Sequence, residues 1–96
     1  MSEAEIEDLI ERLGQLGFAP WYRKPGRDGW PADEAPHMHV VWAAAPMKAT
    51  LRAQIRDFLV GKNGLASHTT YTFHAWSPFA IDRVRKAFLA NNRGVE

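Results

Sequence analysis

Apolar residues recur at helical spacing in the first sixteen positions of the chain. Ser2, followed by Glu5 three positions later, fits a capping box, and Gly17 is placed to end a helix. The pattern predicts an amphipathic helix over residues 3–16. The apolar residues at helical spacing are Ile6, Leu9, Ile10, Leu13 and Leu16.

Two stretches with the character of β-strands follow. Residues 18–23 are rich in aromatic side chains, and Pro20 makes this strand an edge strand or an irregular one. Residues 37–43 alternate, so His37 and His39 lie on one face of the predicted strand. We expect Trp21 and Trp42 to fill the core of the sheet.

The second half of the chain predicts two more helices and one more strand. Pro46 suits the first position of a helix over 47–60. The alternation in residues 67–76 predicts a third strand, and Ser77 with Pro78 caps a last helix that Gly94 ends. The order is αββαβα, an α+β fold with a small, mostly antiparallel three-stranded sheet packed against helices.

Composition limits what this chain can be. Its 96 residues are 46% hydrophobic, which suits one domain over 1–96. The absence of cysteine excludes disulfides and thiolate metal sites, so a metal would be held by His, Asp or Glu. The longest apolar run, 40–47, is too short to span a membrane. The acidic N-terminus resembles no signal or transit peptide, so we expect a cytoplasmic protein.

The strongest local signal for chemistry is His37-Met38-His39. Two imidazoles that are two positions apart on a strand point the same way and can share one metal ion or one substrate. Catalytic zinc needs three protein ligands and a water. The alternative is that one histidine packs in the sheet and the other lies at a loop edge.

Several short motifs, in this order and spacing, resemble one group of bacterial and phage proteins. They are Gly17–Arg23, Pro36–Val40, Gln54–Leu59 and Gly61–Ala66. The chain resembles the D-Ala-D-Ala metallopeptidases of the lysostaphin/D-Ala-D-Ala peptidase/hedgehog superfamily. The resemblance implies that His39 is a zinc ligand and that His37 orients or stabilises the oxyanion. The family's earlier His…Asp zinc motif is absent, because no histidine precedes His37.

A rebuilt metal site would need other ligands. If the strand at 67–76 pairs beside the strand at 37–43, His74 or His68 faces the first two histidines. In that case His37 would be catalytic, His39 and His74 would hold zinc, and Asp33 or Glu34 would supply a carboxylate. The alternative places His68 in a turn and His74 on the solvent face of a strand.

Other side chains are candidate contacts for a partner. In the long loop 24–36, with its three prolines and two glycines, Trp30 and Arg27 are predicted to touch a partner. Lys48, Arg52 and Arg56 form a basic stripe on the predicted second helix that could contact phosphates. The alternative is that the stripe only solubilises the helix.

These observations favour a small non-catalytic protein-binding module. The resemblance implies a peptidase-like half-domain encoded by a phage or mobile element, acting as an inhibitor of a host system. We expect a protein partner and no cofactor, and a homodimer fits equally well. The first alternative is a zinc-dependent peptidoglycan peptidase that uses His37 and His39. The second is a nucleic-acid contact protein, although the net charge is only +1.

Overall fold

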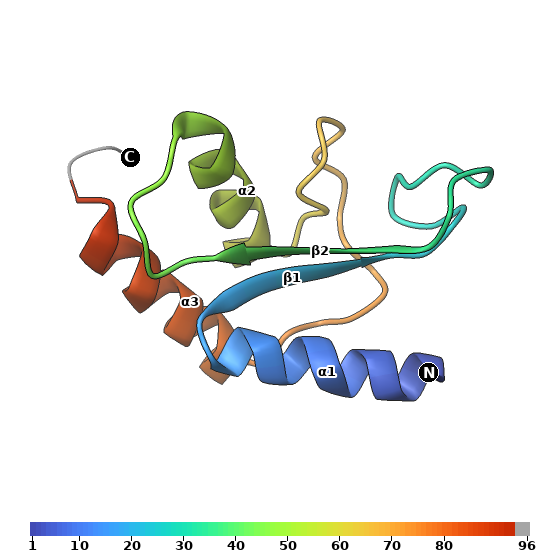
Figure 1. The fold of residues 1–96 in the computed structure, drawn as a ribbon, viewed down its shortest axis with the longest axis horizontal. Helices are drawn as coiled ribbons and strands as arrows, with labels where there is room; N and C mark the ends of the chain where they lie inside the picture. The colour runs from blue at the N-terminus through green and yellow to red at the C-terminus, as the bar shows by residue number, and fades with distance from the viewer. Residues whose placement is uncertain (94–96) are drawn as a thin grey trace.

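The computed structural model describes residues 1–93 and contains three helices and a two-stranded antiparallel sheet. This arrangement confirms the α+β class. In Figure 1 helix α1 runs along one side of the sheet, while helix α2 and the segment that follows it lie on the other. The elements are α1 (Glu3–Gln15), β1 (Phe18–Arg23), β2 (His37–Trp42), α2 (Ala49–Leu59) and α3 (Pro78–Asn91).

The caps of the first and last helices form as the sequence predicts. Ser2 accepts a hydrogen bond from the Glu5 backbone N–H, and the Glu5 carboxylate accepts one from the Ser2 backbone. Gly17, just after α1, has φ +95°, a conformation that a side chain disfavours. Ser77 caps α3 through the Ala80 N–H. The predicted end of this helix at Gly94 lies outside the described residues.

The sheet places one face of each strand in the core. Antiparallel pairing sets Trp21 opposite His39 and Arg23 opposite His37. Trp21 is fully buried, as predicted, but Trp42 is 47% exposed and the prediction that it fills the core was wrong. Trp42 lies on the opposite face of β2 from Val41, where its ring covers only Phe18 at 4.5 Å.

The third strand expected at 67–76 is not shown. Within residues 1–93, Thr70 alone of this stretch makes an antiparallel bridge, to Lys62. The physical reason is that side chains satisfy the backbone: the Asp28 carboxylate accepts the N–H groups of Thr72 and Phe73. His68 also has φ +50°, which interrupts an extended chain.

Helix α2 is shorter than the predicted 47–60, and it starts three residues after Pro46. The reason is that Met47 is tied down outside the helix. Its N–H donates to Asn92 Oδ1, and its carbonyl accepts from Arg52. Lys48 is extended and takes the N-cap position without a side-chain hydrogen bond.

Aromatic and branched side chains from every element meet in one core around Trp21. The Trp21 ring meets Phe58 edge-on at 5.8 Å, and Phe58 contacts Trp76 at 4.5 Å. The apolar core residues with 0% exposure are Ile10, Ala19, Trp21, Ala43, Ile55, Phe58, Ala80 and Val84.

No helix within residues 1–93 combines the length and the apolar character needed to cross a membrane.

Candidate functional site

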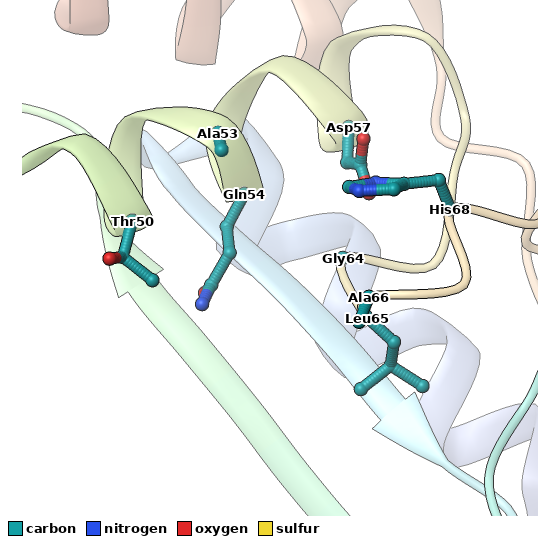
Figure 2. A pocket seen from close by; sticks show the side chains of 8 residues that line it. All are labelled: Thr50, Ala53, Gln54, Asp57, Gly64, Leu65, Ala66 and His68. Carbon is teal, nitrogen blue, oxygen red and sulfur yellow. The ribbon is translucent and has the colours of Figure 1, made fainter.

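A groove opens on the face of the sheet opposite α1. It consists of two adjoining hollows of about 210 and 230 Å³ that share Gln54, Gly64 and Leu65. Figure 2 shows the hollow beside α2, with the Gln54 side chain extending from the helix toward the strands. The rest of the lining comes from the strands, the long loop, α2 and the segment that follows α2: Arg23, Trp30, His37, His39, Thr50, Ala53, Asp57, Ala66 and His68.

Arg23 carries the main charge of the groove. The residue is only 4% exposed, yet its guanidinium makes no salt bridge with any carboxylate of the described residues. Its Nη1 donates to the Asn63 carbonyl, and the group lies 5.4 Å from the centre of the Trp21 ring. Burial lowers the pKa of Arg23, while Tyr71 and Asp28 act in the opposite direction. An arginine remains charged under these conditions.

The two histidines of β2 line the groove beside Arg23, on the same face of the strand as predicted. His39 Nε2 lies 2.7 Å from Gln54 Oε1, and the ring stacks on Trp21 at 5.8 Å. His37 is exposed and stacks on Trp30 at 6.0 Å. Trp30 is half-buried rather than free, because its indole N–H donates to the Ala35 carbonyl.

An Asp–His pair forms the far end of the groove. His68 Nδ1 lies 2.8 Å from Asp57 Oδ2, and Figure 2 shows the imidazole facing that carboxylate. The Asp57 side chain is 11% exposed and the His68 side chain is 56% exposed. The pair therefore ties the segment after α2 back to the helix while the ring stays open to water.

Asn63 holds the wall of the groove in place. Its side chain is completely buried, and its Nδ2 lies within hydrogen-bond distance of the Asp28 carbonyl, Ser67 Oγ and Thr69 Oγ1. Its Oδ1 accepts from the Leu65 N–H. Because its carbonyl also accepts from Arg23, this one residue connects the long loop, the wall and the buried charge.

His74 is not part of the groove. Its Nδ1 lies 3.1 Å from Glu7 Oε1 and its Nε2 lies 3.1 Å from Glu11 Oε1, both on α1. The structure therefore does not bring His74 to His39, because the expected third strand does not form beside β2. Burial by itself raises the pKa of Glu11, but hydrogen bonds from Gln15, Ser77 and His74 outweigh it and lower the pKa to about 2.

The basic residues that were predicted to contact a partner lie in the long loop and along α2 with its N-cap. Arg27 is engaged internally: Nε donates to Thr72 Oγ1 and Nη2 to the Thr72 carbonyl, with the Phe73 ring 5.6 Å away. On α2, Lys48 and Arg56 are exposed, and Arg52 donates to the Met47 carbonyl. The structure thus gives Arg27 a structural role in holding the segment that was expected to form a strand.

In the hollow lined by His37 and His39, the other polar groups are the Arg23 guanidinium, which is cationic, and the Gln54 amide, while Asp57 and His68 line the adjoining hollow. In the part of the chain that the structure describes, no three His, Asp or Glu side chains gather as metal ligands. His74, which was predicted to hold zinc together with His39, lies at α1 and not beside His37 and His39. The predicted roles of His37 as catalytic residue and His39 as zinc ligand stay predictions.

Sequence reasoning found the histidines of the groove but missed Arg23, Gln54, Asp57 and Asn63. The signal for Arg23 was present in the sequence, because strand alternation puts position 23 on the same side as Ala19 and Trp21. Comparison with protein-family models, with curated proteins and with solved structures gave no match. The resemblance to the D-Ala-D-Ala metallopeptidases stays a prediction.

Proposed function

We propose that the chain is a non-catalytic protein-binding module whose groove takes a partner segment that presents a carboxylate. The observation that carries the proposal is Arg23, a buried guanidinium in the groove that makes no salt bridge with a carboxylate of residues 1–93. The carboxylate comes from an acidic side chain or from a chain terminus, since both offer the same two oxygens.

The physical argument concerns the cost of a buried charge. A guanidinium that leaves water without an anion is penalised by several kcal/mol. A carboxylate that enters the groove removes this penalty and can form paired N–H···O hydrogen bonds with the planar guanidinium. His37 and His39 border the same hollow.

The groove also offers apolar and planar surfaces for the rest of the segment. Trp30 stacks over His37 at one end, and Leu65 and Ala66 line the wall. Arg and Trp are frequent energetic centres of protein interfaces. In this proposal the module acts by occupying a protein surface, as an inhibitor of a host system would if a phage or mobile element encodes it.

Calorimetric titration with three short peptides tests this function. The first two peptides share one uncharged sequence, of which one ends in a free carboxylate and the other in an amide. The third ends in an amide and differs from the second by one aspartate. We expect the two carboxylate peptides to bind and the neutral amide to bind at least about tenfold more weakly. Equal binding of the free acid and the amide, or no binding by any peptide, contradicts the proposal.

Variants assign the binding to the groove. Arg23→Lys keeps the charge but loses the planar fork, and it should weaken binding of the acid peptides. His37→Ala changes an exposed side chain of the groove that makes no hydrogen bond within the described residues, so it should fold and bind more weakly. Arg83→Ala, on the exposed face of α3, is the matched control and should bind as the wild type does.

A further inference from the structure

The outer edge of β2 is open. The Ala43 N–H donates to the Gly17 carbonyl, so this pair of residues is hydrogen-bonded across the sheet. Hydrogen-bonded pairs alternate along an antiparallel sheet, so Val40 and its partner Pro20, which has no N–H, form a pair that is not hydrogen-bonded. By alternation, the backbone groups of Met38, Val40 and Trp42 point away from β1. No other element of residues 1–93 donates to them or accepts from them.

The opposite edge of the sheet is closed by one side chain. The Tyr71 hydroxyl accepts the Tyr22 N–H at 2.9 Å and donates to the Tyr22 carbonyl at 3.0 Å. Pro20, two residues before Tyr22, has no N–H to offer on that edge. An added strand can therefore pair with β2 and not with β1.

The side chains beside the open edge are apolar and exposed. Val40 is 40% exposed and Trp42 is 47% exposed, and by alternation both lie on the face of β2 opposite His37 and His39. Leu16, 60% exposed, immediately precedes Gly17, where an added Cβ would lie 3.9 Å from the Trp42 ring. These three residues form what we call the apolar edge surface. It carries no Lys, Pro or other feature that proteins use to protect an open strand.

We propose that the open edge of β2 pairs with β2 of a second copy of this chain. Antiparallel pairing about a two-fold axis sets Val40 against Val40 of the second copy and Met38 against Trp42 of the second copy. Met38, Val40 and Trp42, whose backbone groups point away from β1, each then lie opposite an apolar residue. The two sheets join into one sheet of four strands. Because Tyr71 closes the other edge, the assembly stops at two copies.

The occupant is a second copy because the edge is self-complementary. Its outward residues are apolar on both sides of Val40, so the two-fold operation brings no like charges together. A two-stranded sheet is also marginal in water, and two further strands stabilise it. The groove lies on the other face of the sheet, so this proposal is independent of the proposed function.

Sedimentation equilibrium over a concentration series tests the dimer. We expect the full chain to move from monomer to dimer with increasing concentration and not beyond. Val40→Lys places two ammonium groups opposite each other at the axis and should raise the dissociation constant more than about a hundredfold. Val60→Lys, at a 68% exposed position at the end of α2, is the matched control and should dimerise normally.

Hydrogen exchange gives a second readout. In the wild type, the backbone N–H at position 40 should exchange slowly at concentrations where the dimer predominates. In Val40→Lys the N–H at the same position should exchange quickly, while the Tyr22 N–H, held by Tyr71, should not change. A wild-type chain that stays monomeric at millimolar concentration overturns the proposal. So does a Val40→Lys variant, shown to be folded by circular dichroism, that dimerises as well as Val60→Lys does.

Discussion

Replacing Asn63 by alanine should be the most damaging polar substitution in the groove wall. The change removes a completely buried side chain whose two amide hydrogens are shared among three acceptors and whose Oδ1 accepts one N–H. Ser67 and Thr69, two of the acceptors, belong to exposed residues, so water can replace these contacts. The contacts with the Asp28 carbonyl and the Leu65 N–H are lost in the interior of the wall.

The magnitude follows from these contacts. Each buried bond contributes about 1 kcal/mol, and the void left by the amide adds to the loss, for a total of about 3 kcal/mol. In a domain of this size such a loss lowers the melting temperature by roughly 12 to 24 °C. The free energy of unfolding is measured by urea denaturation of the wild type and of Asn63→Ala.

Asn91→Ala is the matched control. Asn91 is an exposed residue at the end of α3 with a single side-chain hydrogen bond, to the Ala87 carbonyl, and its loss should cost less than about 0.5 kcal/mol. If the two alanine variants are equally stable, Asn63 does not hold the wall. In that case the account of how Arg23 is positioned is also wrong.

Three further substitutions test other parts of the structure. Glu11→Gln removes a carboxylate whose pKa is about 2 in the folded chain, against an ordinary 4.5. Because folding lowers this pKa, the ionised carboxylate stabilises the folded state by about 2 kcal/mol after solvent screening. This stabilisation is present above pH 4.5 and is lost as the pH falls toward 2. Acid titration of the variant should therefore show a smaller loss of stability over this range, and an unchanged acid profile would be evidence against the network. Tyr71→Phe leaves the Tyr22 backbone groups unpaired and should lower the free energy of unfolding by about 1–2 kcal/mol, and an equally stable variant would mean that water caps this edge. Gly64→Ala puts a methyl group 2.8 Å from Trp21 and should destabilise more than Gly61→Ala, which has the same positive φ but no atom within 4 Å; equal losses would show that backbone strain alone matters.

Local sequence signals were sufficient to predict the N-terminal caps of α1 and α3. The capping partners of α1 and α3 are at most three residues apart in sequence, so a pattern that spans one helical turn identifies them. The alternation of β2 was equally local, and it placed His37 and His39 on the face that became the groove.

Long-range side-chain contacts explain what the sequence could not predict. Residues 67–76 have the alternation of a strand, but Asp28, more than forty positions earlier, takes two of their N–H groups. Because residues 67–76 do not pair with β2, His74 lies beside the acidic residues Glu7 and Glu11 of α1 and not beside β2. The exposure of Trp42 has the same origin, since a two-stranded sheet offers no neighbour to cover it.

Nuclear magnetic resonance of the arginine and histidine side chains tests the central claim most directly. During titration with a peptide that ends in a free carboxylate, the Nε–H signal of Arg23 and the ring signals of His37 and His39 should shift together and saturate. The amidated peptide should leave them in place. The claim is contradicted if the acid peptide leaves the Arg23 signal unmoved, or if both peptides shift it equally.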